Sequence, residues 1–332
     1  MIDAALVGLG WWGQRILDSL GNSERMRVVR AVDQNPRTFD ALRDDPQLAL
    51  STELQHALDD ARVEAVILAT PHSLHVEQTE ACAAAGKHVF VEKPLALSRD
   101  GARRAIDACE RAGVQLGVGH ERRFEPAMTE IETLIANGAL GTVMHVEANF
   151  SHDFLARIHP ADWRAAPDES PLPALTGMGI HLTDAYVHLF GPVEEVFTMS
   201  ATRGRAWPCG DTFSVLLRFA SGITGYINAI LETPLFVRLQ VFGSRGWVEA
   251  RSDAHPAEPG VTQLSVCLAE QAPQTRELHY IDSVLANLDA FADAVAGRAS
   301  YPMPNAEKLA NIAVFEAIVA SAKTRAMVRL AE

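Results

Sequence analysis

A glycine pattern near the amino terminus constrains the fold of this chain more than any other feature. Gly8, Gly10 and Gly13 directly follow an apolar run at residues 4–7, and residues 14–20 then carry apolar side chains at helical spacing. This order predicts a strand, a tight turn and a helix. Glycines in such a turn allow the bend, the approach of backbone N–H groups to a diphosphate, and close helix packing. The pattern alone is also typical of a glycine-rich turn that binds nothing.

An acidic residue at the end of the next apolar run supports a dinucleotide site. Residues 26–32 predict a second strand, and Asp33 follows it, twenty residues after Gly13. A carboxylate at this distance accepts hydrogen bonds from the adenosine ribose and repels a 2′-phosphate, which favours NAD over NADP. Arg37 could instead pair with a 2′-phosphate, or could be a solvated residue at a helix start. We therefore expect NAD as the cofactor, with NADP not excluded.

The first half of the chain continues as alternating strands and helices. Apolar runs predict strands at residues 63–69, 88–91 and 114–118, and helical patterns cover 73–85 and 101–112. Alternation of this length predicts a doubly wound parallel sheet of the Rossmann type with helices on both faces. Ligands of such sheets bind beyond the carboxyl ends of the strands, where the following residues fall: Gly8, Asp33, Thr70, Lys93 and His120.

The second half has the pattern of a different architecture. Successive strands are predicted at residues 193–201, 212–219, 223–232, 236–243, 246–250 and 264–268, with tight turns between them. Helices are expected at 126–136 and 179–189 before these strands, and at 284–296 and 306–327 after them. We expect an α/β protein with a Rossmann domain at residues 1–119. An α+β domain with a large, open, mostly antiparallel sheet is expected at residues 120–332.

Composition limits the partners and the compartment. The 332 residues suit two domains, and the net charge of -13 opposes binding to nucleic acid or to an anionic membrane surface. The four cysteines, at positions 82, 109, 209 and 267, show no metal-binding spacing and are expected to be free thiols. No signal peptide or membrane-spanning run is evident, so a cytoplasmic protein without a bound metal is expected.

Several further segments resemble one known family. They are residues 69–75 (ATPHSLH), 85–94 (AGKHVFVEKP), 119–126 (GHERRFEP), Trp163-Arg164, 179–184 (GIHLTD) and 243–246 (GSRG). Together with the glycine pattern they are similar to the Gfo/Idh/MocA oxidoreductases, the family of glucose-fructose oxidoreductase and inositol 2-dehydrogenase. The resemblance covers essentially the whole chain and is specific for the family, but it does not select a substrate.

The resemblance implies roles for residues around the cofactor. Lys93 would stand beside the nicotinamide and polarise the reacting oxygen, and an ammonium group in a partly desolvated cleft suits that task. A surface lysine paired with Glu92 is the alternative. Family members often have the Lys-Pro peptide in the cis form. The residues expected to bind the cofactor are Gly8, Gly10, Trp11, Trp12, Gly13, Asp33, Arg37, Thr70, Pro71, His75, Glu92 and Lys93.

A histidine in the second half resembles the family's catalytic histidine. His181 would take the alcohol proton during oxidation or return it during reduction. Asp184, one helical turn on, could orient His181 or cap the helix. Polyol-oxidising relatives carry an aspartate four residues before this histidine, whereas this chain has Gly177. We therefore expect a less polar pocket, to which Met178, Phe154 and Trp11 contribute.

The remaining substrate-side residues follow from their place in the family motifs. His120, Arg122 and Arg123 come after the last parallel strand, and an arginine there could bind a carboxylate or could link structural elements. Trp163 and Arg164 are expected on a loop that faces the cleft. The residues expected on the substrate side are therefore His120, Arg122, Arg123, Phe154, Trp163, Arg164, Met178 and Asp184.

The sequence supports a leading function and an alternative from another class. The leading one is an NAD(P)-dependent dehydrogenase or reductase that acts on a small molecule, namely a sugar derivative, a cyclitol, or a cyclic diol that could carry a carboxylate. Lys93 and His181 would handle the proton. The alternative is a cofactor-binding sensor or scaffold without turnover, because the carboxylate is missing at Gly177. A homodimer or homotetramer that associates through the carboxyl-terminal sheet is expected in either case.

Overall fold

The computed structural model describes residues 1–40, 42–43, 45–154, 158–159, 162–204, 210–255 and 257–330. The chain forms two compact units. The first comprises Met1–Glu121 and Val284–Leu309, and the second comprises Arg122–Ser283 and Ala310–Glu332. The sequence pattern predicts a single domain boundary near Gly119. In the structure the chain leaves the first unit after Glu121 and returns to it at Val284.

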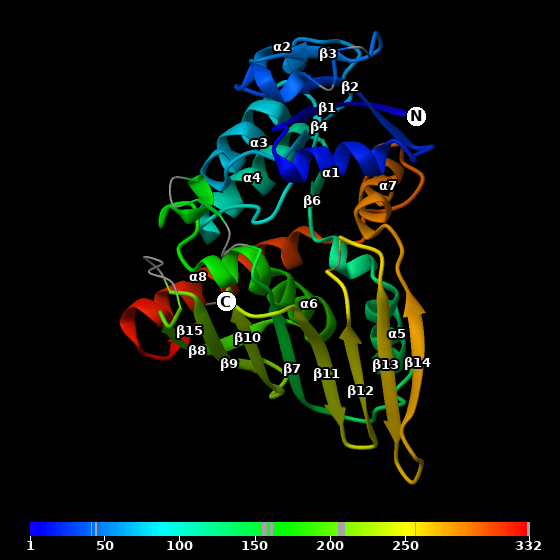
Figure 1. Cartoon of the computed structure of the whole chain (residues 1–332), viewed down its shortest axis with the longest axis vertical. Helices are drawn as coiled ribbons and strands as arrows, with labels where there is room; N and C mark the ends of the chain where they lie inside the picture. Colours follow the sequence, from blue (N-terminus) through cyan, green and yellow to red (C-terminus); the bar gives the residue numbers. More distant parts are fainter. Residues whose placement is uncertain are drawn as a thin grey trace. The chain divides into compact units, whose positions relative to one another are not determined.

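The first unit is built on a parallel sheet. Its strands lie in the order β3-β2-β1-β4-β5-β6, and each neighbouring pair is parallel (Figure 1). The strands are β1 Ile2–Val7, β2 Met26–Val32, β3 Ala49–Ser51, β4 Ala65–Leu68, β5 His88–Val91 and β6 Leu116–Val118. The predicted Rossmann sheet is confirmed. The sequence analysis missed β3, which has only three residues, each of them partly exposed.

Helices cover this sheet, and one of them comes from late in the chain. The helices are α1 Trp11–Leu20, α2 Gln55–Leu58, α3 His75–Ala84, α4 Arg99–Ala112 and α7 Ser283–Val295, with short 3-10 turns η1 Pro36–Phe39 and η2 His72–Leu74. On α7, Phe291 is fully buried and meets Phe90 of β5 edge-on, with 5.5 Å between ring centroids. The core of the first unit therefore depends on a helix that lies in sequence between the two segments of the second unit.

The second unit contains a nine-stranded sheet in the order β14-β13-β12-β11-β7-β10-β9-β8-β15 (Figure 1). The strands are β7 Val143–Ser151, β8 Val193–Ala201, β9 Thr212–Phe219, β10 Thr224–Ile230, β11 Phe236–Gly243, β12 Gly246–Ser252, β13 Val261–Leu268, β14 Gln274–His279 and β15 Val328–Arg329. Among the pairings of the described strands, β10 with β7 is parallel and the others are antiparallel. The expectation of a large, mostly antiparallel sheet is confirmed, and three strands are added to the six predicted.

One face of this sheet is packed and the other is open. The helical elements are α5 Pro126–Ala136, α6 Ile180–Phe190, α8 Asn305–Thr324 and the short turns η3 Glu121–Phe124, η5 Trp163–Ala165 and η6 Leu175–Gly179. On β9, Val215, Leu217 and Phe219 are buried, and Phe219 lies 5.8 Å from the Tyr186 ring of α6. Leu216 alternates with them and is 58% exposed. The packed face therefore lies under α6, and the opposite face of β9 presents apolar surface.

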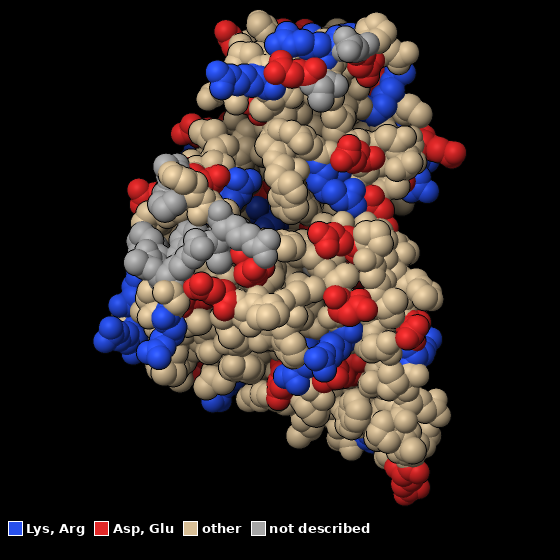
Figure 2. Space-filling view, in the orientation of Figure 1, with Lys and Arg blue, Asp and Glu red and all other residues tan. Residues whose placement is uncertain are grey.

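Charges of both signs mix on the molecular surface. Figure 2 shows acidic and basic side chains interspersed on the face in view, and surface pairs such as Arg276 with Glu130 join them. Among the described helices, none combines the length and apolar composition that a bilayer crossing requires. Cys82, Cys109 and Cys267 are free thiols, as expected, and Cys209 lies outside the described residues.

Candidate active site

The three glycines of the loop in the first unit have different roles. Gly8 and Gly13 are required by the backbone, whereas Gly10 borders open space. A side chain at Gly13 would begin 1.9 Å from the carbonyl oxygen of Gly8, and Gly8 itself has φ of +93°. Both positions therefore require glycine for the strand-to-helix turn. A side chain at Gly10 would meet no atom within 4 Å. Since α1 begins at Trp11 with no acidic residue in its first turn, the open space at Gly10 fits a phosphate group at the positive end of the helix.

The acidic residue after β2 is fixed against this loop. The Leu9 N–H donates to Asp33 Oδ2 at 2.7 Å, and the Asn35 N–H donates to Asp33 Oδ1 at 2.8 Å. Each carboxylate oxygen has a second lone pair, so Asp33 keeps acceptor capacity for ribose hydroxyls. Arg37 lies exposed on η1, two residues beyond Asn35. These residues fit the adenosine end of a dinucleotide.

Two tryptophans extend from the glycine loop into the start of α1. Trp11 is 63% exposed, whereas Trp12 is partly buried, and their ring centroids lie 5.3 Å apart. An exposed indole of this size at a ligand-binding loop offers a flat apolar surface. Trp11 is thus available to a bound molecule, and Trp12 packs closer to the core.

A buried histidine joins the loops that follow β4 and β5. His75 has no exposed surface, and its Nδ1 and Nε2 lie 2.7 Å from the Pro94 carbonyl oxygen and 3.0 Å from the Thr70 carbonyl oxygen. Thr70 also donates from Oγ1 to Gln78 Oε1 at 2.6 Å. The loop of Thr70 and Pro71 is therefore held beside the loop of Lys93 and Pro94. Both lie beyond carboxyl ends of parallel strands, where doubly wound sheets bind ligands.

The Glu92-Lys93-Pro94 segment carries an unusual carboxyl group. Glu92 is 7% exposed, and this burial raises its pKa to about 7, although the Trp12 indole and the Lys93 ammonium oppose the shift. The Lys93 N–H donates to Glu92 Oε2 at 3.2 Å, and the Lys93-Pro94 peptide is cis. His120, after β6, is also buried in this unit. Lys93 is partly exposed and lies two residues beyond the end of β5.

In the second unit, His181 lies in the first turn of α6. It is 5% exposed, and its ring centroid lies 6.3 Å from that of Phe150, the penultimate residue of β7. The π-helical turn η6 precedes α6 and contains Gly177 and Met178. Met178 has no exposed surface, so its thioether contributes to the core at this turn. The backbone turn before His181 thus carries neither a carboxylate nor an accessible methionine.

The two adjacent arginines are both held by carboxylates. Arg123 Nε and Nη2 each donate to Asp184 at 2.7 Å, and both side chains are at most 5% exposed. Arg122 Nε and Nη2 donate to Glu125 at 2.8 and 3.2 Å, and its guanidinium lies 4.8 Å from the Phe150 centroid. Arg123 and Asp184 therefore fasten η3 to α6, which is a bidentate, charge-assisted contact. Arg122 instead keeps one nitrogen, Nη1, buried and without a hydrogen-bond partner among the described residues.

Trp163 and Arg164 form a local pair on η5. The Arg164 guanidinium lies 4.2 Å from the Trp163 ring centroid, and the Asp162 carboxylate accepts the Arg164 N–H at 2.9 Å. Burial lowers the pKa of Arg164, and Asp162 opposes that shift. The stacking orders the indole and the guanidinium relative to one another.

Four rings form a connected cluster, which we call the ring group, and one of them, Phe150, lies beside His181. They are Phe150, His152, Phe154 and His255. Sequence reasoning included Phe154 among the substrate-side residues but missed His255, which reaches the group from the loop between β12 and β13. No local motif marks that loop. Only the sheet register, which brings the end of β12 to this region, could have indicated it.

Family models match both halves of the chain. The model described as "Oxidoreductase family, NAD-binding Rossmann fold" matches residues 2–120, and the model described as "GFO/IDH/MocA C-terminal domain" matches residues 128–249. Together they cover more than half of the 332 residues. The glycine loop and Lys93 fall in the first match, and His181 falls in the second.

Individual proteins are similar as well. The chain is 30% identical to D-xylose 1-dehydrogenase (NADP(+)) 2 of Haloferax volcanii over 82% of each chain. It is 34% identical to scyllo-inositol 2-dehydrogenase (NADP(+)) of Bacillus subtilis over 57% of this chain and 52% of that one. Its structure matches aldose-aldose oxidoreductase of Caulobacter crescentus with a TM-score of 0.88 and 26% identity, over 99% of both chains.

These matches agree with the geometry of the glycine loop, with Asp33 at the end of β2, and with the ordered loops after β4 and β5. The resemblance inferred from the motifs is confirmed. The protein belongs to the Gfo/Idh/MocA family of NAD(P)-dependent oxidoreductases.

Proposed function

We propose that this protein is an NAD(P)-dependent dehydrogenase or reductase for a small cyclic molecule that carries a CH–OH or C=O group. Its substrate class is a sugar derivative, a cyclitol or a cyclic diol, and Lys93 and His181 handle the proton. A bound nicotinamide cofactor accepts or supplies the hydride. The observation that carries the proposal is the anchoring of the Lys93-Pro94 loop by His75 to the loop after β4.

Residues of the first unit suit cofactor binding and polarisation of the reacting oxygen. The open space at Gly10 admits a phosphate, and Asp33 has acceptor capacity for ribose hydroxyls. The Lys93 ammonium would donate a hydrogen bond to the substrate oxygen and stabilise negative charge that develops on it. The relatives named for xylose and scyllo-inositol dehydrogenation support the choice of an alcohol carbon on a ring.

His181 suits the transfer of the alcohol proton. An imidazole takes a proton during oxidation and returns it during reduction at near-neutral pH. Because Gly177 stands where the family resemblance leads us to expect a carboxylate, proton transfer here would rest on His181 and Lys93 with water or the substrate. That same absence favours the second candidate, a cofactor-binding sensor or scaffold without turnover.

A substrate panel with one variant distinguishes the two candidates. Wild-type protein should form NADH or NADPH from at least one of a set of polyols, sugar acids and cis-diols, followed by absorbance. Lys93→Met should lower kcat by roughly 10²-fold or more, since a positioned donor contributes about that much, and should keep its affinity for NAD.

The control removes an ammonium group elsewhere. Lys323→Met changes an exposed lysine on α8 and should leave kcat and KM unchanged. Full activity in Lys93→Met would contradict the role of Lys93. A wild-type protein that binds NAD but turns over no member of the panel would favour the sensor.

A further inference from the structure

The loop between β12 and β13 holds His255 in a fixed place. The Val261 N–H donates to Asp253 Oδ1 at 2.8 Å, and the Asp253 N–H donates to the Val261 carbonyl at 3.2 Å. The Glu258 N–H donates to the His255 carbonyl at 2.8 Å. A side chain at Gly260 would begin 2.2 Å from the Ala254 Cβ, so the loop closes on itself there. His255 therefore projects from a backbone with several internal bonds.

His255 and His152 are held in the same way on two different loops. The Ala257 N–H donates to His255 Nδ1 at 3.2 Å, and the Phe154 N–H donates to His152 Nδ1 at 3.1 Å. In each case the donor lies two residues after the histidine. The same local contact therefore fixes the orientation of each imidazole relative to its own loop. The two ring centroids lie 5.3 Å apart at 72°.

The ring group has a buried layer and an accessible layer. Phe150 and His152 are at most 5% exposed, whereas Phe154 is 38% exposed and His255 is partly exposed. Phe154 and His255 lie 5.2 Å apart, and each lies within 5.3 Å of His152. Phe150 connects the group to His181. The accessible surface of Phe154 and His255 thus belongs to the same cluster of rings as the proposed proton-transfer group.

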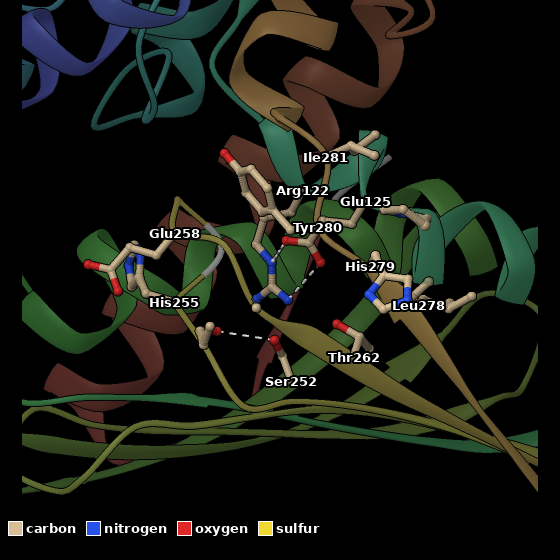
Figure 3. A pocket seen from close by; sticks show the side chains of 14 residues that line it. Arg122, Glu125, Ser252, His255, Glu258, Thr262, Leu278, His279, Tyr280 and Ile281 are labelled. Atoms are coloured by element: carbon tan, nitrogen blue, oxygen red, sulfur yellow. Dashed lines mark hydrogen bonds and ion pairs between the residues drawn. The ribbon is translucent and has the colours of Figure 1, made fainter.

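The charged side chains named beside His255 carry a net negative charge, because one guanidinium faces two carboxylates. His255 and Glu258 line a small pocket together with the Arg122-Glu125 pair, and Figure 3 shows this pair between His255 on one side and His279 on the other. Glu125 neutralises Arg122, and Glu258 adds a second carboxylate. A ligand carboxylate would therefore meet no surplus positive charge from these groups.

We propose that His255 determines substrate specificity: with Phe154 it forms the wall against which the ring of a neutral cyclic substrate packs. This inference rests on the proposed function, since it concerns the substrate whose alcohol proton His181 would transfer. Flat aromatic and imidazole faces bury the apolar face of a sugar, cyclitol or cyclic diol, whose C–H groups lie on that face. Since the neighbouring guanidinium is neutralised, the wall favours an uncharged ring over a ring that carries a carboxylate.

Two substitutions separate the ring of His255 from its hydrogen bond. His255→Phe keeps a flat ring and loses the acceptor for the Ala257 N–H. His255→Asn keeps a short acceptor for that N–H and loses the ring. With the neutral cyclic substrate that wild-type protein oxidises best, His255→Asn should raise KM roughly fivefold, while His255→Phe should stay within about twofold of wild type. Neither variant should change the NAD dissociation constant, and kcat should change by less than about threefold in both.

The matched control is His145→Asn, which makes the same change on β7 at a ring outside the ring group. It should leave KM unchanged. A raised KM in His255→Phe but not in His255→Asn would show that the hydrogen bond from the Ala257 N–H matters and that the ring does not. That result would contradict the proposal that the His255 ring packs against the substrate. Unchanged KM in both variants would also overturn it.

The charge preference is tested on the wild-type protein with matched substrates. A neutral cyclic cis-diol and its ring-carboxylated analogue are compared, and the neutral compound should have the higher kcat/KM. A higher kcat/KM for the carboxylated compound would overturn the preference for an uncharged ring. If NAD binds but no ring compound is turned over, the proposed function fails and this inference fails with it. If turnover occurs and the variants match wild type, only the inference fails.

Discussion

At the scale of single residues, the buried carboxyl group beside Lys93 has a measurable consequence. Burial raises the pKa of Glu92 to about 7. An unfolded chain releases that proton near pH 4.3, so between these values the folded state holds a proton that the unfolded state has lost. Stability from this group is therefore full at low pH and is lost as pH rises from about 4.3 to about 7, by about 4 kcal/mol in total.

Replacing Glu92 by glutamine should remove this slope, because glutamine is neutral at every pH. Urea unfolding at pH 5, 6, 7 and 8 measures the free energy of unfolding for both proteins. Glu92→Gln should match wild type near pH 5 and become relatively more stable by pH 8. Two stability curves that run parallel over this range would contradict the raised pKa of Glu92.

We expect Asp33 to set the preference between the two nicotinamide cofactors. Its carboxylate is fixed by the N–H groups of Leu9 and Asn35, so its negative charge stays at the end of β2. Asp33→Asn keeps an acceptor oxygen and removes the charge that repels a 2′-phosphate. The ratio of NADPH to NADH affinity, measured by nucleotide fluorescence, should rise roughly tenfold. An unchanged ratio would assign the choice to another group, with Arg37 as the first to test.

The residues of the site differ in how far the sequence could reveal them. Gly8, Gly13 and Asp33 belong to one short strand-turn-helix-strand unit, so their spacing along the chain reflects their spacing in the fold. His255 lies 74 residues after His181, and it nears that histidine's ring cluster only because β12 and β7 both pair with β11. Such a contact depends on sheet order, which local patterns do not encode.

At the scale of elements, the strand-turn-helix unit of β1 and α1 makes a paired prediction. Gly10→Ala places its methyl group in open space and should change the free energy of unfolding by less than about 1 kcal/mol, yet weaken NAD binding by steric exclusion. Gly13→Ala places a methyl group against the Gly8 carbonyl and should cost about 3 kcal/mol or more.

Urea unfolding and nucleotide titration of the two variants test this pair together. The pair shares one chemical change, so each variant serves as the control for the other. If Gly10→Ala binds NAD as wild type does, the open space at Gly10 is not where the diphosphate lies. If Gly13→Ala is as stable as wild type, the turn can relax and the close contact is not a requirement of the fold.

Strand β7 shows why element prediction was incomplete. Val146, Ala148 and Phe150 are buried and alternate with His145, Glu147 and Asn149, which is the period-two pattern of a strand with one packed face. The pattern was present but was not recognised. Strand β14 is different, because all of its residues except Leu278 are polar and exposed at the sheet edge, so it carries no alternating hydrophobic signal.

At the scale of the whole molecule, each of the two units is built from two separate segments of the chain, and these segments alternate along the sequence. Residues Val284–Leu309 belong to the first unit, where Phe291 packs against Phe90. The sequence analysis predicted a helix there and assigned it to the second domain, because amphipathic helices carry no mark of the sheet that they cover. Fold class followed from local patterns, whereas the assignment of this helix depends on contacts between residues some two hundred positions apart.

The open face of the nine-stranded sheet leads to a prediction about assembly. Leu216 is 58% exposed in the middle of β9, and its cross-strand neighbours Phe197 and Tyr226 are only partly buried. Apolar surface of this kind is commonly covered by association. We expect wild-type protein to form a homodimer or homotetramer through this face. Light scattering at micromolar concentration should then give a multiple of the 36.0 kDa chain mass.

Leu216→Glu tests whether this face is the interface. Association would bury the new carboxylate against Phe197 and Tyr226 without a partner charge, which costs several kcal/mol and should shift the mass toward that of the monomer. Gln271→Glu adds the same charge at an exposed turn between β13 and β14 and should leave the mass unchanged. An assembly that survives Leu216→Glu must use a different surface, and a monomeric wild type would mean that this apolar face remains open to solvent.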